Sequence, residues 1–290
     1  MSSYQDYEKI ANMAKIKKNT GKTVVYLFLS LWAVVVLFPF YWMILSSVKT
    51  EGEYRQAVPT FWPQQFMFSN YVRAFTDAKL GDLIMHTVFV GILSTLFSLV
   101  ITVLSAFAFA RLAFKGKDLL FGALLATMMI PGELFTITNY ITVNRLEWMN
   151  TYTALIVPFL VSVFYIYLLR QTFQQIPNEL YLAAKVDGTT DIKYLWKVMV
   201  PLAKPTIITI AVLKMMGAWN TYIWPKLVAN DEAHMLITNG LRNAFVANSG
   251  QVNYPVQMAA VAIVSIPLFA VFVFLRKYIM AGVSRSGIKG

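Results

Sequence analysis

The hydrophobic residues of this chain gather into six long apolar segments separated by polar stretches. A bilayer-spanning helix needs roughly 20 apolar residues, and each segment is near or above that length. Chains that cross a bilayer repeatedly without β-barrel alternation do so as helices. The pattern therefore predicts an all-α polytopic membrane protein with six spans, at Thr23–Val48, Leu83–Ala110, about Leu119–Val143, Thr151–Leu169, Pro205–Val228 and Pro255–Leu275.

The polar stretches define the expected organisation of the chain. Residues 1–22 form a polar, lysine-rich N-terminal arm, residues 23–275 the transmembrane domain and residues 276–290 a basic C-terminal tail. A secretory signal is the competing interpretation of a basic start followed by an apolar run. Thr23–Val48 is too long for a signal core and no small-residue cleavage site follows it, so we interpret it as the first span.

Composition agrees with a membrane protein and excludes several kinds of chemistry. The chain is 58% hydrophobic and 13% charged, and it has no cysteine. Disulfides, thiolate metal sites and cysteine catalysis are therefore excluded. The two histidines, His86 and His234, are far apart in the sequence and offer no metal-ligand spacing. No Gly-Lys-Ser/Thr phosphate loop is present, so we expect no cofactor on this chain and no ATP bound in that way.

The distribution of basic residues predicts the orientation in the membrane. The net charge of +11 would suggest a nucleic-acid partner in a soluble protein. Here seventeen of the lysines and arginines lie on the side of the termini and seven on the other side. Because basic residues concentrate in cytoplasmic loops, we expect both termini and residues 170–204 to be cytoplasmic and expect no nucleic acid as partner.

The longest polar stretch on the basic side, Ile176–Thr206, has the pattern of two helices joined by a turn. Asn178 is positioned to cap the first helix, and Asp187-Gly188 to end it. An amphipathic stretch, Ile192–Val200, follows, and Pro201 and Pro205 are expected to stop it. The small pair Ala183-Ala184 allows close approach of another protein, so the stretch is predicted to be a docking element.

The same residues resemble a known motif, the EAA loop of importer-type ABC transporter permeases. The match covers Ala183, Ala184, Asp187, Gly188, Pro201, Leu202 and Pro205. In that family the loop forms the coupling helices that sit in a cleft of the cytoplasmic ATPase. The sequence departs from the motif at Leu182, where the family has glutamate, and at Thr189, where it has alanine. Glu179, nearly one turn earlier, is the candidate to replace the missing glutamate.

Further short motifs resemble the carbohydrate-uptake, MalG-like branch of this family. They lie along nearly the whole chain, at Asn70–Phe75, Met128–Pro131, Leu168–Gln171, Trp219-Asn220, Trp224-Pro225, Arg276–Tyr278, Ala281–Val283 and Gly287–Gly290. The resemblance implies the type I importer permease fold, located in the bacterial cytoplasmic membrane. It also implies a second permease, two ATPase subunits that carry ATP and Mg, and an extracytoplasmic solute-binding protein. ATP chemistry would then belong to another chain, and this one would not be an enzyme.

The C-terminal tail has a role in the resembled family, where it reaches into the ATPase dimer. The residues of this tail that match are Gly287, Lys289 and Gly290. The alternative is a basic end that lies near anionic lipid.

Five residues in or near the spans are candidates for the solute path, namely Glu133, Asn139, Lys214, Trp219 and Asn220. Lys214 is the clearest anomaly, because a cation at mid-span depth costs a few kcal/mol and needs a partner or a wet cavity. It either lines the path, with the small residues Ala211, Ala218 and Thr221 on its helical face, or forms a structural tether, for example to Glu133. Trp219, Tyr222 and Trp224 are suited to stack on sugars, but aromatic residues also belong at the membrane interface.

Three alternatives to sugar import remain at this level. A glycerol-phosphate importer of the same family has Trp-Pro where this chain has Tyr254-Pro255. An ion-coupled secondary carrier would need no ATPase, and it would normally show inverted repeats and paired ionisable groups at mid-depth. A membrane-embedded enzyme would need catalytic groups clustered near one interface, and the spans offer only scattered ones.

Overall fold

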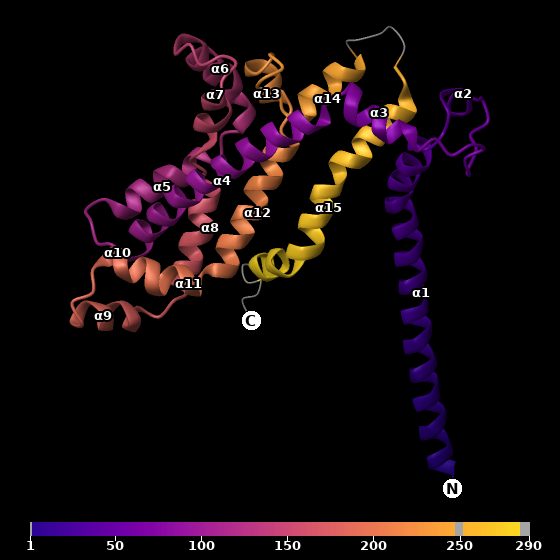
Figure 1. Ribbon diagram of the computed structural model, residues 1–290. Coiled ribbons are helices and arrows are strands. Elements are labelled where there is room, and N and C mark those ends of the chain that lie inside the picture. The colour runs from indigo at the N-terminus through magenta and orange to yellow at the C-terminus, as the bar shows by residue number, and fades with distance from the viewer. Residues whose placement is uncertain (1, 247–251, 285–290) are drawn as a thin grey trace. The chain divides into compact units, whose positions relative to one another are not determined.

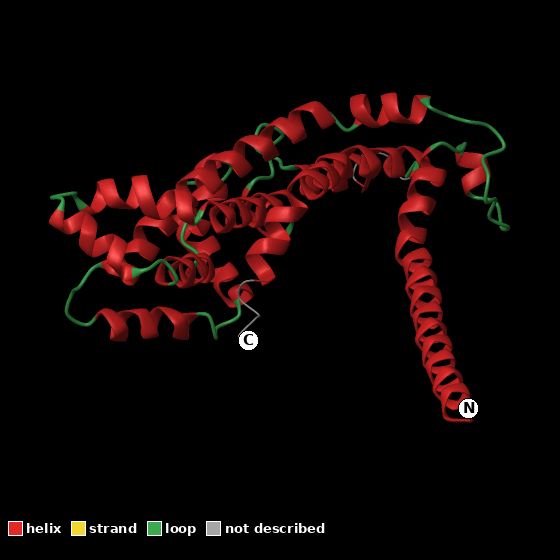
Figure 2. Cartoon of the chain, turned by 90° about the horizontal axis from the view of Figure 1, so that it is seen from below, coloured by secondary structure: helices red, strands yellow, loops and turns green. Residues whose placement is uncertain are grey.

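A computed structural model describes residues 2–246 and 252–284, and this part of the chain is built of helices and loops with no strand (Figures 1 and 2). It divides into two compact units, one of residues 2–72 and 253–262 and the other of residues 73–246, 252 and 263–284. The all-α prediction is confirmed. The helices begin and end as follows: α1 Ser2–Ser47, α2 Glu51–Tyr54, α3 Ser69–Asp77, α4 Leu80–Arg111, α5 Lys117–Thr127, α6 Phe135–Arg145, α7 Tyr152–Ile156, α8 Val163–Gln174, α9 Asn178–Val186, α10 Asp191–Tyr194, α11 Val200–Leu202, α12 Lys204–Asn220, α13 Ile223–Val228, α14 Ile237–Val246 and α15 Tyr254–Ser284.

The first unit is held together where α1 ends. The buried amide of Asn70 donates hydrogen bonds of 2.9 Å to the carbonyls of Ser47 and Lys49. The buried carboxylate of Glu53 accepts from the hydroxyl of Thr60 and from the backbone N–H of Gln64. These bonds order the loop between α2 and α3. Helix α1 is continuous through Lys22 and Pro39, so the predicted boundary between arm and first span is not a helix end.

The second unit is organised around α4, which packs most extensively against α8 and α12 (Figure 1). The largest buried cluster lies at one end of these helices. Its members are Val103, Ala106, Phe107, Leu169, Phe173, Ile176, Tyr194, Leu195, Met199, Ala203 and Ile210. Tyr194, Leu195 and Met199 come from the predicted docking stretch, so the second part of that stretch is anchored in the core.

Length and apolarity are sufficient for up to six spans in the described chain. Three are single helices, Lys22–Ser47, Leu80–Arg111 and Tyr254–Arg276. Three are bent pairs, in which Lys117–Thr127 meets Gly132–Arg145 at 80°, Tyr152–Phe159 meets Val163–Gln174 at 47° and Asp191–Leu202 meets Lys204–Asn220 at 81°. The six-span prediction is therefore supported. The break at Pro131–Glu133 was expected from the sequence, whereas the break at Leu160–Ser162 was not.

Helices α4 and α12 approach each other closely at Gly91. A Cβ atom placed on Gly91 would lie 2.5 Å from the sulfur of Met215, inside van der Waals contact. Gly122 on α5 has nothing within 4 Å of the same position. A larger side chain at Gly91 must therefore displace the end of the Met215 side chain, whereas one at Gly122 meets open space.

We expect Gly91→Leu to destabilise the purified protein by about 1–3 kcal/mol, the usual cost of overpacking a helix contact. Gly122→Leu is the matched control and should leave the thermal unfolding temperature in detergent unchanged. Equal unfolding temperatures for the two variants would contradict the close packing of α4 on α12.

Candidate functional site

The predicted docking loop contains a helix, α9 (Figure 1). None of the residues of α9 is buried. Its apolar side chains Leu182 and Val186 are 55% and 88% exposed. Because these two residues are four apart, they lie on one face of the helix, and Glu179 lies on the same face one turn earlier. Leu182 thus adds an exposed apolar side chain where the motif has glutamate.

The start of α9 differs from the prediction. Asn178 is the first helical residue, Pro177 stands at the cap position, and no side chain caps the helix. The side-chain oxygen of Asn178 instead accepts a hydrogen bond of 3.2 Å from Arg111 at the end of α4. Competition from this guanidinium, together with a proline that already fixes the entry of the helix, explains why the capping prediction was wrong.

Arg111 joins the end of α4 to the segment that leads into α9. Its guanidinium donates to the carbonyl of Phe173 at 2.9 Å and to the carbonyl of Ile176. These carbonyls belong to the last turn of α8 and to the residues that follow it, where no intrahelical donor is available. One side chain therefore fixes α8 and the start of α9 to the end of α4.

The end of α9 agrees with the prediction. Asp187 is the C-cap residue of α9, and Gly188 follows it with a φ of +67°. The N–H of Thr189 donates to the carbonyl of Ala184 at 2.8 Å, and that of Gly188 to the carbonyl of Lys185 at 3.1 Å. This is the backbone arrangement that favours glycine after a helix. The prediction that Asp187-Gly188 ends the helix is confirmed.

The second half of the loop does not stop at Pro201 as predicted. Helix α10 continues through a π-helical turn, Leu195–Met199, into α11, which contains Pro201. The chain bends only at Ala203, immediately before α12. Proline is tolerated at the first positions of a helix because its missing N–H would have no partner there. The π turn Leu195–Met199 ends directly before α11, so Pro201 stands at the second position of a new helix although the chain does not bend there. Pro201 itself is exposed.

Three side chains connect α9 to α10. The Nζ atom of Lys185 lies 2.7 Å from a carboxylate oxygen of Asp191, and the hydroxyl of Tyr181 donates to the same oxygen at 2.7 Å. The hydrogen bond to Asp191 raises the pKa of Lys185 above its ordinary value. A raised pKa means that the contribution of this pair is complete at neutral pH and is lost only as the pH rises through the folded-state pKa, above 10.5. The geometry of the loop is therefore expected to be constant from pH 6 to pH 9.

Two substitutions at Asp191 separate its contributions to this connection. Asp191→Asn keeps an acceptor for Tyr181 and loses the ion pair, which is half-exposed and therefore weak. We expect it to lower the affinity for a loop-binding partner no more than about fivefold. Asp191→Ala also removes the hydrogen bond and should cost a further factor of up to about ten. Binding titrations with the purified partner measure both, and a larger loss for Asn than for Ala would contradict this connection.

A cavity of about 370 Å³ lies among α4, α8, α12 and α13 in the second unit. Lys214 on α12 lines it, together with Ala218 and Thr221 one and two turns further along the same face. Its other lining residues are Val90, Ser94, Leu155, Phe159, Val161, Ser162, Tyr165, Gly217, Trp224, Pro225 and Leu236. The sequence had singled out Lys214, Ala211, Ala218 and Thr221 as one face; Ala211 does not line the cavity, whereas Ser94, Ser162 and Tyr165 do.

Lys214 does not form the tether to Glu133 that was one of its two predicted roles. Its Nζ atom donates to the carbonyl of Phe159 at 2.5 Å. This carbonyl lies at the break between α7 and α8, where Leu160 and Val161 interrupt the helical hydrogen bonds. Glu133 is exposed and does not line the cavity. Lys214 therefore satisfies part of a broken helix and faces the cavity at the same time.

The other candidate path residues do not line this cavity. Trp219 is buried, and its indole N–H donates to the carbonyl of Val264 at 3.2 Å. The amide of Asn220 bonds back to the carbonyl of Met216 on its own helix. Asn139 is absent from the cavity lining, whereas Trp224 is part of it. Trp224 also donates to the carbonyl of Ala154 at 2.9 Å, so it forms a fixed wall rather than a free surface.

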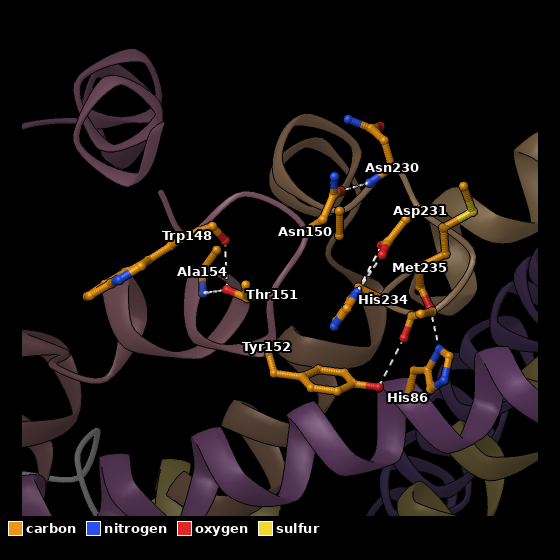
Figure 3. A network of polar contacts seen from close by, with 12 residues as sticks. His86, Trp148, Asn150, Thr151, Tyr152, Ala154, Asn230, Asp231, His234 and Met235 are labelled. Carbon is orange, nitrogen blue, oxygen red and sulfur yellow. Dashed lines mark hydrogen bonds and ion pairs between the residues drawn. The ribbon is translucent and has the colours of Figure 1, made fainter. Parts of the chain in front are cut away.

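A polar network at the other end of α4 fixes the loop that precedes α14 (Figure 3). The hydroxyl of Tyr152 donates to the carbonyl of Ala233 at 3.1 Å, and the ring of His86 lies 3.2 Å from the carbonyl of Met235. His234 pairs with Asp231 at 2.8 Å. The two histidines, far apart in the sequence, thus lie on either side of Tyr152, with ring centroids 6.0 and 4.7 Å away. Among the described residues no group of three potential metal ligands forms.

The predicted contacts of Gly287, Lys289 and Gly290 lie outside the described residues.

Comparison with known proteins places these features in a family. Residues 98–285 match the family described as binding-protein-dependent transport system inner membrane component. The chain belongs to this family. The predicted resemblance to ABC permeases is therefore confirmed, and the protein is a multi-pass inner-membrane component of a transport system.

Individual relatives are carbohydrate permeases of similar length. The chain is 26% identical over 279 residues to the diacetylchitobiose uptake system permease protein NgcG of Streptomyces coelicolor, covering 96% of this chain and 92% of that one. It is 29% identical over 265 residues to the arabinooligosaccharides transport system permease protein AraQ of Halalkalibacterium halodurans, covering 89% and 93%. A solved structure of a bacterial ABC transporter that imports the acidic polysaccharide alginate matches with a TM-score of 0.81 and 24% identity, over 88% of this chain and 95% of that one. The predicted importer permease fold is thus confirmed.

Proposed function

We propose that this chain is one of two transmembrane subunits of an ATP-driven importer for an oligosaccharide. A second, homologous permease completes the translocation path, two cytoplasmic ATPase subunits bind the docking loop, and an extracytoplasmic binding protein delivers the solute. Both termini are cytoplasmic in this proposal. The named relatives support the solute class, because NgcG and AraQ are described as permeases for diacetylchitobiose and arabinooligosaccharides.

The observation that carries the proposal is helix α9, which has no buried residue and exposes Leu182 and Val186, on a loop whose other half is anchored in the core. Tyr194 and Met199 of the anchored half are buried, whereas the described residues of α9 are not. Exposure of apolar side chains to water is unfavourable, so a helix with such side chains is stabilised when another surface covers it. An ATPase cleft supplies such a surface. Its closure on ATP binding would push α9, and the anchored half would transmit the movement to α8, α4 and α12.

The relatives do not favour the glycerol-phosphate alternative, since NgcG and AraQ are permeases for sugars. Membership of the binding-protein-dependent family likewise favours an importer over an ion-coupled carrier.

The test is uptake by the purified complex in liposomes, with its binding protein outside and ATP inside. Arabinotriose and diacetylchitobiose are the first labelled probes, because they represent the solutes of the named relatives. We expect uptake of an oligosaccharide that requires internal ATP and the binding protein. Uptake without ATP, driven by an imposed proton or sodium gradient, would contradict the proposal.

A further inference from the structure

The cavity around Lys214 contains a cation and no acid. None of its lining residues is aspartate or glutamate, and Lys214 has a backbone carbonyl as its recorded partner. A carbonyl satisfies one of the three ammonium donors and leaves the positive charge uncompensated. Since charges in a membrane-spanning region are stable only when paired or hydrated, the cavity favours an occupant with a negative charge.

Two further cations stand beside the same cavity without a carboxylate partner in the described chain. Tyr222 follows the lining residue Thr221. The Nζ atom of Lys226 and the Cζ atom of Arg242 each lie 5.8 Å from the centroid of its ring, in cation–π contact. Arg242 also donates to the hydroxyl of Tyr222. The hydroxyl of Thr238 on α14 donates to the carbonyl of Thr221, which fixes α14, and therefore Arg242, next to the cavity wall.

Three other cations on the same predicted outer side have carboxylate partners, whereas Lys49 donates to the carbonyl of Thr60 and Arg145 forms no ion pair among the described residues. Lys79 lies 2.7 Å from a carboxylate oxygen of Glu232, Arg55 lies 2.5 Å from Glu51, and Arg73 lies 3.8 Å from Asp77. Lys214, Lys226 and Arg242 form no ion pair within the described part of the chain. Lys214 is thus a cation without an ion pair inside the cavity, and Lys226 and Arg242 are two more on the neighbouring helices α13 and α14.

The remaining cavity lining fits a sugar. Hydroxyl groups of Ser94, Tyr165 and Thr221 provide donors and acceptors, and Trp224 and Phe159 provide an aromatic wall, with their rings edge to face at 5.3 Å. Apolar walls with a few convergent polar groups are typical of small-molecule sites. A volume of about 370 Å³ accommodates part of an oligosaccharide rather than a long chain.

We infer that this cavity binds the acidic group of a negatively charged oligosaccharide, with a carboxylate on the sugar ring at Lys214. The inference rests on the proposed function and specifies its solute class. Lys226 and Arg242 attract the solute to the cavity, and Lys214 forms the ion pair within it. An importer with this subunit therefore selects sugar acids over neutral sugars of the same length.

The test is uptake of paired trisaccharides by the full importer in liposomes with ATP inside. The probes are trisaccharides of galacturonate, mannuronate and glucuronate, each beside its carboxyl-reduced neutral counterpart, and glycerol 3-phosphate. We expect ATP-dependent uptake of at least one uronate and little uptake of its neutral counterpart. Uptake of a neutral trisaccharide or of glycerol 3-phosphate, with none of the uronates, would overturn the inference and leave ATP-driven import intact. Loss of ATP dependence would instead contradict the proposed function.

Substitution at Lys214 tests the role of this residue. Lys214→Met should lower uptake of the uronate at least about thirtyfold, because the acidic group then enters without a partner. Lys214→Arg keeps the charge and should retain most of the uptake. Lys79→Met is the matched control, since Lys79 already has a carboxylate partner, and it should remain within about threefold of the wild type.

Lys214→Met is informative only if the complex assembles, so the amount of ATPase that co-purifies with each variant is measured in parallel. Normal assembly with normal uronate uptake in Lys214→Met would overturn the inference. A second result would also overturn it. In that result the complex fails to assemble with Lys214→Met but assembles with both Lys214→Arg and Lys214→Gln, and these last two variants take up the uronate equally well. That result would reduce Lys214 to a donor for the Phe159 carbonyl.

Discussion

Val186→Asp is expected to abolish ATP-driven uptake, with a loss of at least about a hundredfold. Val186 is the last residue of α9 and is 88% exposed, so the aspartate costs the isolated chain little. In the assembled importer the same position would face the ATPase, where a carboxylate must lose its water without gaining a partner. An unpaired charge buried at an interface typically costs several kcal/mol.

The measurement is the amount of ATPase that co-purifies with the variant, together with uptake in liposomes. Val58→Asp is the matched control, because Val58 is 77% exposed on the loop between α2 and α3, on the predicted outer side. It carries the same change and should retain the ATPase fully. Normal ATPase recovery with Val186→Asp, or equal losses for both variants, would show that α9 is not the docking surface.

Arg111→Gln is expected to uncouple solute uptake from ATP hydrolysis while the complex stays assembled. Arg111 holds the carbonyls of Phe173 and Ile176 and the side chain of Asn178, and so joins α9 to the end of α4. Hydrogen bonds from a charged donor contribute about 1.5–3 kcal/mol each, and glutamine cannot reach all three acceptors. We expect the ATPase to remain bound and to hydrolyse ATP, while uptake per ATP falls about tenfold or more.

Two further variants, Arg111→Lys and Arg170→Gln, make this prediction specific. Arg111→Lys keeps the charge but loses the planar fork, so it should resemble Arg111→Gln. Arg170 is the control, since it also donates to a carbonyl, that of Phe109 at 3.1 Å, but its hydrogen bonds go to Phe109 and Gln174 rather than to α9. Arg170→Gln should affect stability more than coupling. Unchanged uptake per ATP in Arg111→Gln would contradict a mechanical link through this side chain.

Much of the fold was predictable because membrane spans have a strong local signal. Apolar length alone indicated six segments, and Pro131-Gly132 indicated one of the three bends. The turn after α9 was predictable as well, because glycine adopts the positive φ of Gly188 at no steric cost. These features depend on residues close together in the sequence.

The features that were missed depend on residues far apart in the sequence. Asn178 was expected to cap its own helix, but the competing donor, Arg111, lies on another helix. The partner of Lys214 is a backbone carbonyl, that of Phe159, which lies beside Pro158 at a break in the helix and 55 residues away in the sequence. His86 and His234 meet around Tyr152 only because α4 and the loop before α14 fold together. A single sequence carries little signal for such contacts.

The cavity was predicted in part. The spacing of Lys214, Ala211, Ala218 and Thr221 placed them on one face, and three of these four residues, all but Ala211, line one cavity. Trp219 and Asn220 were attractive because of their residue types, yet their polar atoms bond to Val264 and Met216 within the described helices. Whether an aromatic or amide side chain faces a path depends on how α12 packs against its neighbours. The residue type alone does not indicate this packing.

The central claim, that this chain is a permease driven by ATPase subunits bound at α9, is tested most directly by the mass of the native complex. The protein would be purified gently from its own host in detergent and examined by native mass spectrometry. The account predicts a particle with one copy of this chain, a second permease and two ATPase subunits, and loss of the ATPases from Val186→Asp. A lone chain or a simple homodimer that still transports in liposomes without ATP would contradict it.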